Sequence, residues 1–460
     1  MVAMVNGPAV AGSNGAGHHT RRGRAAIVGG VRTPMAKAGT AFRSVHVTEL
    51  ARTAFQQVLY RTGVNPDQLD EVLLGNVVLP VDATNPARVS ALWAGIPHAV
   101  PALTLQRNCA SGLEAVAEAA MRVVNAARRR EALGEGGARF LLAGGAESMS
   151  TIPLLFPNET LTPMERMYRA KGPVQKLGAI ASLRPRHFTP VAGLEIGLTD
   201  PTVDMIMGKT AELLASEFGL SRKEQDEFAL RSHQRAAAAQ AAGRFKDEIV
   251  PMYVPGKGGF EAVVDDVGPR AGQTMEALGK LKPIFDRRDG TVTVGNACQV
   301  TDGAVALLMT DEEQAHAEGM EVLGYVRSYA CVGLDPARMG LGPVYAIDKL
   351  LRQTGLSLSD VPLVEINEAF AAQVLACLRA MASDKFCQDQ LGRTSAIGEL
   401  DMERLNVNGG AIALGHPVGA TGARLVLTLL HEMRRRDVDM AIAALCVGGG
   451  QGAAMLIERK

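Results

Sequence analysis

One order of segments occurs twice in this chain, and it limits the fold more than any other feature. Each copy has an apolar strand, a turn with reactive or glycine-rich residues, a helix, a second apolar strand and a glycine run. The first copy spans 102–145 and carries Cys109 in its turn, and the second spans 405–450 and carries His416. Such a repeat predicts two similar α/β halves that pack against each other.

The expected strands are continuous apolar runs, as in sheets that are covered on both faces. Further runs of this kind lie at 25–30, 72–78, 139–142 and 303–309. An amphipathic helix is expected over 48–60. Together with the repeat, these segments predict a layered α/β fold class.

The segment 151–299 interrupts this order, because it has several Pro and Gly breaks and no regular alternation of strand and helix. Ser221 and Glu224 form a capping box that opens a helix inside it. We therefore expect an inserted loop or lid domain at 151–299. The N-terminal half would consist of 24–150 plus 300–318, and the C-terminal half of 319–460.

Residues 1–23 are rich in Gly, Ala and His, and no basic segment precedes an apolar core there. We expect a disordered N-terminal tail at 1–23 and a cytoplasmic protein, with a transit peptide to the mitochondrial matrix as the alternative. The sequence contains no run of about 18 apolar residues, so a transmembrane helix is not expected.

Composition argues against several functional classes. Lys plus Arg equals Asp plus Glu at 48 each, and aromatic residues make up 4%, so neither a basic field nor a base-stacking surface for nucleic acid is indicated. The six cysteines form no CxxC pair and no Cys/His group has zinc spacing. We expect a reducing compartment and no metal site.

Cys109 stands where an apolar strand turns into a long helix. The helix N-terminus and nearby backbone N–H groups favour a thiolate, so the turn predicts a nucleophile. The alternative is a packed, structural cysteine, which is what we expect of Cys331, Cys377 and Cys387.

Two more stretches carry reactive side chains among glycines. His416 lies in 409–422, where glycines would bring the backbone close to a ligand and the imidazole would act as a base on a thiol. Cys446 begins 446–452, which offers a second thiol and free N–H groups for an oxyanion. The alternatives are a tight turn with a structural histidine and a plain glycine hairpin.

Asn367 and Glu368 directly follow the strand-like segment 363–366. Polar residues at a strand end form loop sites in α/β proteins. The alternative is that Asn367 caps the next helix.

Four of these stretches together resemble the motifs of the thiolase family. They are 108–112 (nucleophile), 367–370 (NEAF), 406–422 (histidine) and 446–450 (CxG), and the resemblance runs from about 25 to 458. It implies the duplicated five-layer thiolase fold, with two βαβαβαββ-type halves and an inserted loop domain. It also implies an acyltransferase that cleaves 3-ketoacyl-CoA with CoA or runs the reverse condensation.

The resemblance also implies roles for single residues. Cys109 would carry the acyl group, His416 would take the Cys109 proton, and Cys446 would move protons. One oxyanion hole would consist of His416 and a water held by Asn367, and the other of the N–H groups of Cys109 and Gly448. Coenzyme A is then a substrate, and neither a cofactor nor a metal is expected.

For the pantetheine arm of CoA, the resemblance points to Met207, Val294, Cys298, Met339, Ala369 and Phe370. This chain departs from many short-chain thiolases at two of these places. Ile206 precedes Met207 where those enzymes have His, and Cys298 stands where they have Ser.

Other parts of the chain resemble the β subunits of trifunctional fatty-acid-oxidation complexes. The function we expect is therefore that of a degradative 3-ketoacyl-CoA thiolase in β-oxidation. The alternatives are a short-chain acetyl-CoA acetyltransferase for biosynthesis, a decarboxylating ketoacyl synthase, which the second thiol of Cys446 disfavours, and a non-catalytic acyl-CoA- or lipid-binding protein.

Expected partners are acyl-CoA, CoA, further copies of the chain in a homodimer or homotetramer, and a hydratase/dehydrogenase α subunit. Nucleic acid is not among them. The basic segment 161–187 is a candidate for peripheral membrane contact, with a solvated lid as the alternative.

Overall fold

The computed structural model describes residues 23–133, 139–256 and 258–460. The tail expected at 1–23 lies, apart from its last residue, outside this part of the chain. Among the described residues, no helix combines the length and the apolar character that a membrane crossing requires.

A mixed sheet with ten strands joins the two halves of the molecule. Its order is β14-β15-β16-β13-β1-β12-β5-β3-β4, with the short β2 (Ala36–Lys37) paired to β12. The strands are β1 (Ala25–Arg32), β3 (Leu69–Gly75), β4 (Ala102–Leu105), β5 (Phe140–Glu147), β12 (Thr301–Asp311), β13 (Gly324–Gly333), β14 (Leu363–Ile366), β15 (Met440–Val447) and β16 (Gln451–Glu458).

The sheet repeats one pattern on either side of its centre. In the N-terminal half, β3 runs parallel to β5, and β5 runs antiparallel to β12. In the C-terminal half, β14 runs parallel to β15, and β15 runs antiparallel to β16. Because β1 pairs with both β12 and β13, it connects the halves. The internal repeat expected from the sequence is therefore present in the sheet.

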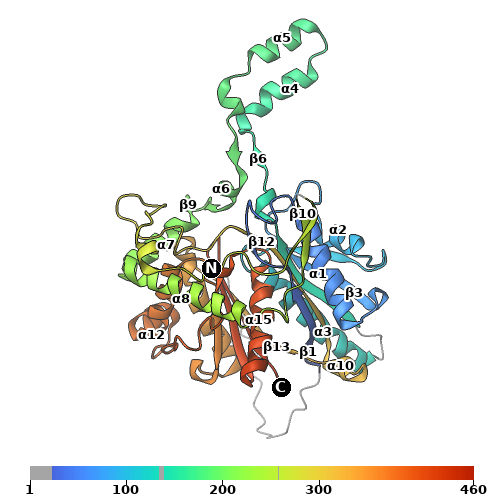
Figure 1. Cartoon of the computed structure of the whole chain (residues 1–460), viewed down its shortest axis with the longest axis vertical. Coiled ribbons are helices and arrows are strands. Elements are labelled where there is room, and N and C mark those ends of the chain that lie inside the picture. Colours follow the sequence, from blue (N-terminus) through green and yellow to red (C-terminus); the bar gives the residue numbers. More distant parts are fainter. Residues whose placement is uncertain (1–22, 134–138, 257) are drawn as a thin grey trace, which may run out of the picture.

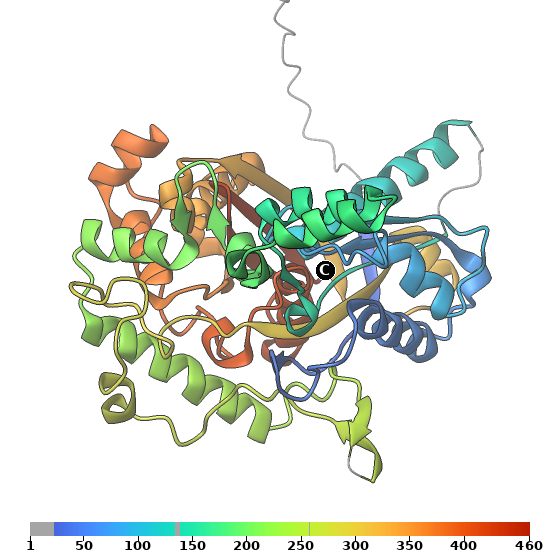
Figure 2. The same cartoon turned by 90° about the horizontal axis from the view of Figure 1, so that it is seen from above.

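Helices form three layers around and between the two halves of the sheet. α3 (Ser111–Leu133) and α15 (Thr421–Arg436) pack on each other in the middle. α1 (Val47–Thr62) and α2 (Pro86–Trp93) cover the N-terminal half, and α11 (Gly342–Thr354) and α12 (Ala371–Ala382) cover the C-terminal half. The order helix, sheet, helix, sheet, helix confirms the five-layer class, and Figure 2 shows the two halves side by side.

Glycines bring the two central helices into close contact. A Cβ on Gly422 would lie 2.4 Å from the backbone N of Leu113, and one on Gly112 would lie 2.7 Å from the carbonyl O of Gly419. The starts of α3 and α15 therefore meet backbone to backbone. As a result, the Cys109 turn and the His416 loop, 307 residues apart in sequence, lie next to each other.

The expected end of β5 is wrong. The sequence suggests a strand that stops at Leu142 before a glycine loop, but β5 continues to Glu147. Gly144 and Gly145 pair with β12, and a Cβ on Gly145 would lie only 2.0 Å from the carbonyl O of Gly419. These glycines thus permit a close backbone approach inside a strand.

Segment 151–299 has two parts. A helical hairpin, α4 (Leu161–Arg169) and α5 (Pro173–Ala181), projects from the body on a stalk formed by β6 (Leu154–Leu155) and β7 (Val191–Ala192) (Figure 1). Behind the stalk, the chain turns back to the body.

The returning chain forms further short elements and two longer helices. They are α6 (Gly193–Gly197), β8 (Thr199–Asp200), β9 (Met205–Ile206), α7 (Met207–Glu217), α8 (Arg222–Ala241), β10 (Met252–Gly256), β11 (Gly259–Val263) and α9 (Met275–Gly279). Ser221 caps α8 as expected. Since α7 and α8 pack on α12, this part of the segment belongs to the body of the C-terminal half. The remaining helices are α10 (Glu312–Ala317), α13 (Asp384–Leu391) and α14 (Ala411–Leu414).

Candidate active site

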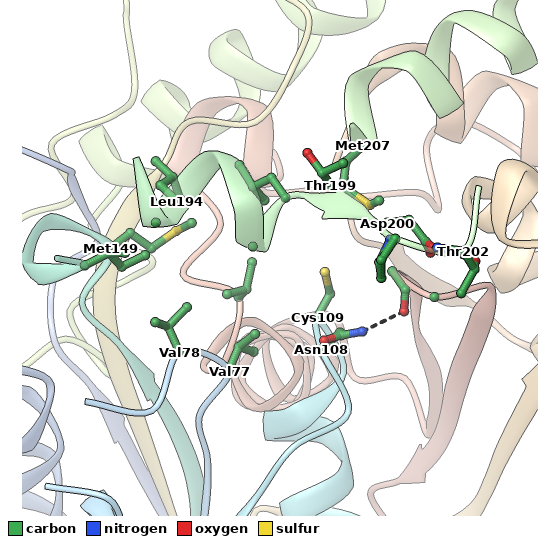
Figure 3. Close-up of a pocket in the computed structure, with 18 residues that line it drawn as sticks. Val77, Val78, Asn108, Cys109, Met149, Leu194, Thr199, Asp200, Thr202 and Met207 are labelled. Atoms are coloured by element: carbon green, nitrogen blue, oxygen red, sulfur yellow. Dashed lines mark hydrogen bonds between the residues drawn. The ribbon is translucent and has the colours of Figure 1, made fainter. Parts of the chain in front are cut away.

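The turn that carries Cys109 is held by its own side chains. Asn108 has a positive φ of 42°, which asparagine tolerates better than most residues. The Ser111 hydroxyl accepts a hydrogen bond from the Arg107 N–H (2.9 Å) and donates one to the Asn108 carbonyl (2.7 Å). Asn108 Nδ2 donates to the Gly448 carbonyl at 2.7 Å (Figure 3). The Cys109 turn is therefore tied to the loop that follows Cys446.

Cys109 opens onto a cavity of about 340 Å³ between the body and the base of the inserted segment. Its walls are mainly apolar, and Figure 3 shows Val77 and Val78 on one side with Leu194 across from them. The lining includes Val77, Val78, Asn108, Cys109, Met149, Ile152, Leu194, Thr199, Asp200, Met207, Val418, Gly448 and Gly449. The insert thus roofs the cavity through α6 and β8.

The expectation that the helix start favours a thiolate is wrong for the empty site. Burial raises the pKa of the Cys109 thiol to about 11, and the charge of Glu147 raises it further. The backbone N–H groups of Gly448 and of Cys109 itself lower this pKa, but by less than burial raises it. Cys109 therefore keeps its proton at neutral pH until a base removes it. The two N–H groups at the sulfur are those expected for an oxyanion hole.

His416 is buried (4% exposed) and its ring is fixed on both sides. Nδ1 lies 2.6 Å from Thr421 Oγ1, and the Thr421 hydroxyl donates to the Pro417 carbonyl. Since that hydroxyl proton is already used, Nδ1–H is the donor and Nε2 carries a lone pair. Burial, together with the charge of Arg424, lowers the pKa of His416 to about 3, so the ring is neutral.

Asn367 meets His416 rather than capping a helix. Its Nδ2 lies 3.3 Å from His416 Nε2, while α12 begins after Phe370 and has no side-chain cap. Among the residues that the structure describes, the buried Oδ1 of Asn367 has no hydrogen-bond partner. A buried amide oxygen ordinarily has one, which fits the expectation of a bound water here.

Glu368 has a structural position beside Asn367. Its buried carboxylate accepts hydrogen bonds from Ser232 Oγ (2.6 Å), Asn406 Nδ2 (2.9 Å) and the Ile412 N–H (3.2 Å). It thereby anchors the segment that leads into the His416 loop.

Cys446 is buried at the end of β15, directly before the glycine turn to β16. Burial raises the pKa of its thiol well above the ordinary value, and the charges of Cys109, Cys377 and Cys298 raise it further. Gly449 and Gly450 have φ of 83° and 71°, so the glycine run also makes a hairpin turn. The hairpin alternative is thus present in the geometry, and the Gly448 N–H of the same turn faces the Cys109 thiol.

The residues expected to contact pantetheine fall into three groups. Met207 lines the cavity beside Cys109. Cys298 donates its N–H to the Ala369 carbonyl at 2.9 Å, and Phe370 follows directly. Val294 is 62% exposed, and Met339 (3% exposed) packs in the C-terminal core. Of the six residues predicted for pantetheine, Met207 alone lies on the wall of the cavity described above.

Sequence reasoning missed most of the cavity wall. Val77, Val78 and Leu194 come from segments without any reactive motif, and Val418 lies in the histidine motif but was not predicted to line a cavity. Glu147 was overlooked as well, although a carboxylate after a buried Gly-Gly strand is a signal for a buried polar role.

Comparison with known proteins agrees with these motifs. The family model described as "Thiolase, N-terminal domain" matches residues 25–313, and "Thiolase, C-terminal domain" matches 320–459. A 3-ketoacyl-CoA thiolase of Yersinia enterocolitica is 40% identical over 441 residues, covering 95% of this chain and 98% of the relative. An acetyl-CoA acetyltransferase of Pseudomonas aeruginosa is 43% identical over 435 residues, covering 94% and 98%.

Solved structures show the same likeness. The crystal structure of the Bacillus anthracis acetyl-CoA acetyltransferase matches with a TM-score of 0.81 and 38% identity, covering 95% of this chain and 99% of that one. Human mitochondrial 3-ketoacyl-CoA thiolase matches with a TM-score of 0.80 and 36% identity, again covering 95% and 99%. A further structure of that human enzyme is in complex with CoA.

Proposed function

This chain belongs to the thiolase family and is an acyltransferase, and from that premise we propose that it works in the degradative direction of fatty-acid β-oxidation. Thiolases cleave 3-ketoacyl-CoA with CoA or run the reverse condensation. The observation that carries the degradative role is the apolar cavity that opens from Cys109 under the insert, because an acyl tail needs such a space.

In the first half of the reaction, Cys109 gives its proton to His416 Nε2 and its sulfur bonds to the keto carbon of the substrate. The N–H groups that face Cys109 Sγ, those of Cys109 and Gly448, support an oxyanion there. The bond between carbons 2 and 3 then breaks, and the electron pair leaves with the acetyl-CoA enolate. Cys446 protonates that enolate at carbon and becomes a thiolate.

The enolate needs donors of its own. His416 and a water held by Asn367 suit this role, because the Asn367 amide lies against His416 Nε2 and its oxygen is without a described partner.

In the second half, free CoA gives its thiol proton to Cys446 and attacks the acyl-Cys109 thioester. Cys109 leaves as a thiolate and takes back the proton that His416 held. Two thiols are needed because one carries the acyl group while the other moves protons. CoA and acyl-CoA are substrates in this scheme, and no further cofactor is needed. We also propose that the enzyme acts in the cytoplasm.

The degradative role is tested by measuring thiolysis on 3-ketoacyl-CoA substrates from four to sixteen carbons. We expect substantial rates beyond four carbons. A steep fall after four carbons would instead support short-chain acetyl-CoA acetyltransferase activity, the name that the Pseudomonas relative carries.

A matched pair of variants ties the result to the cavity. Leu194→Trp fills the cavity, whereas Ile196→Trp changes an exposed residue of the same helix. Leu194→Trp is expected to lower the rate on eight carbons and longer by about tenfold and to spare four carbons. Equal effects of the two variants would count against this acyl site.

The non-catalytic alternative is tested by intact-mass measurement after mixing with acetyl-CoA. An added acetyl group that disappears in Cys109→Ala supports the enzyme. A folded protein that stays unacetylated would support a binding protein instead.

We further propose that the chain forms a homodimer through the free edge of β4, the last strand of the sheet. A free edge is a ready site for pairing with a second copy about a two-fold axis. Exposed Leu103 on β4 adds apolar surface at this edge. A homotetramer would join two such dimers.

We also propose that the hairpin of α4 and α5 contacts an anionic membrane surface. Segment 161–187 has six basic residues and one acidic residue. Tyr168, Val174 and Leu177 are exposed on the projecting helices. Basic charge next to exposed apolar side chains suits anionic lipid headgroups.

Flotation with vesicles of phosphatidylglycerol and phosphatidylcholine tests the membrane contact. Binding should require the anionic lipid and should decrease in the double variant Tyr168→Ser/Leu177→Ser. The control Tyr253→Ser, which changes an exposed tyrosine on β10, should bind like the wild type. Absence of vesicle binding would refute the membrane contact. Binding of a hydratase/dehydrogenase α subunit to the hairpin, without binding to vesicles, would instead assign this surface to that subunit.

A further inference from the structure

Glu147 is a buried carboxylate that the reaction scheme leaves unused. It is the last residue of β5 and is 1% exposed. Burial raises its pKa to about 7, although four N–H groups donate to it. Burying a carboxylate costs free energy, so a buried carboxylate with all these hydrogen bonds indicates a specific role.

The four donors come from two different walls of the site. Asn76 Nδ2 (3.0 Å) and the Val78 N–H (3.1 Å) donate to Oε1. The Val77 N–H (2.9 Å) and the Gly419 N–H (3.1 Å) donate to Oε2. Val77 and Val78 line the cavity, and Gly419 lies three residues after His416. One carboxylate therefore joins the acyl-facing wall to the histidine loop.

Packing around Gly419 leaves this junction little freedom. A Cβ on Gly419 would lie 2.7 Å from both Glu147 Oε2 and the Ala146 carbonyl. On the other wall, the Asn76 N–H donates to the Leu105 carbonyl at 3.1 Å, at the end of the strand before the Cys109 turn. A shift of Glu147 would thus move Val77 and Val78 relative to both His416 and Cys109.

We propose that Glu147 is a positioning residue that sets the acyl-facing wall, Val77 and Val78, against the histidine loop at Gly419. It does not touch the reacting atoms. It fixes where the acyl tail lies relative to Cys109, so substrates that press on this wall depend on it most. This inference rests on the proposed thiolase function.

Glu147→Gln tests the proposal with little change in shape. The new NH₂ group would face N–H donors, so two of the four hydrogen bonds are lost. We expect kcat on an eight-carbon 3-ketoacyl-CoA to fall by up to about 10²-fold, because small misplacements cost rate. The fall on acetoacetyl-CoA should be at least fivefold smaller. Glu147→Asp, which keeps the carboxylate, should recover part of the loss.

Glu248→Gln is the matched control. Glu248 is equally buried and accepts hydrogen bonds from Arg32 Nε (2.8 Å) and Thr428 Oγ1 (3.0 Å), but it does not line the cavity. This variant should lose thermal stability and keep the wild-type ratio between eight-carbon and four-carbon rates.

The outcomes distinguish failure of the positioning role of Glu147 from failure of the thiolase function. If Glu147→Gln lowers both rates equally, or lowers neither, the positioning role is wrong while the thiolase function stands. If Glu147→Gln does not fold, the same ratio is measured on Glu147→Asp, and an unchanged ratio there refutes the role. A folded wild-type protein without thiolysis on any chain length would refute the function itself.

Discussion

At the scale of single residues, the protonation of Cys109 is set by its surroundings more than by its place at a helix start. Burial raises the pKa of this thiol above its ordinary value, to about 11. His416 is neutral and Cys109 is protonated, so the reaction that we propose requires the Cys109 proton to move to His416.

This protonation predicts the pH dependence of alkylation in the empty enzyme. The thiolate is the reactive form, and a pKa near 11 leaves the thiol protonated below that pH. The rate of modification of the Cys109 peptide by iodoacetamide should therefore rise about tenfold per pH unit from pH 7 to 10. A plateau that begins near pH 8 would contradict the raised pKa. Cys109→Ser gives the background from the other cysteines.

Asn367 offers a second prediction at this scale. Asn367→Ala removes the amide beside His416 Nε2, and with it the support of one oxyanion. We expect kcat to fall by about 10²–10³-fold. Asn65→Ala, which removes an exposed cap far from the site, should leave kcat unchanged. A kcat of Asn367→Ala within threefold of wild type, with the protein folded, would argue against its role.

At the scale of elements, the contact between α3 and α15 brings the two reactive loops together. The contact depends on glycine, because a Cβ on Gly422 would lie 2.4 Å from the Leu113 backbone N. The same helices in a looser arrangement would separate the Cys109 turn from the His416 loop. The element pair is therefore both the centre of the fold and the support of the site.

Gly422→Ala tests this contact. The added methyl group forces the helix starts apart, so we expect the free energy of unfolding to fall by about 1–3 kcal/mol. Activity should fall with it, measured on protein that is still folded. Gly279→Ala is the control, since a Cβ there meets open space, and its stability should change by less than about 0.5 kcal/mol. Similar behaviour of both variants would disprove the tight contact.

At the scale of the whole molecule, the continuous sheet ends at β4 on one side, and no other strand of the described residues pairs with its outer edge. That edge lies next to the Cys109 turn, since β4 ends only four residues before it. A dimer formed there would place two active sites close to the shared interface.

The dimer is tested by mass photometry across a range of concentrations. Wild-type protein should have twice the monomer mass of 48.5 kDa, or four times that mass if dimers pair. Leu103→Arg should shift it toward monomer, whereas Tyr60→Arg, on the outer helix α1, should not. A wild-type protein that remains monomeric throughout would rule the dimer out.

Local patterns carried much of the fold prediction. The bounds of β14 match the expected strand 363–366, and the Ser221 cap of α8 was visible as a four-residue motif. Where glycines served a long-range contact, as in β5, the local signal suggested a loop and was wrong.

By itself, the sequence determined the alternation of strands and helices and the duplication, and it predicts the candidate set Cys109, Asn367, His416 and Cys446. Hydrophobic runs and short motifs consist of a few neighbouring residues, so they can be recognised in a single sequence. Only the tertiary structure decided which distant segments share a cavity, how the insert divides into a projecting hairpin and a packed part, and which state Cys109 and Glu147 adopt. These depend on burial and close packing between segments far apart in sequence, which no local pattern records.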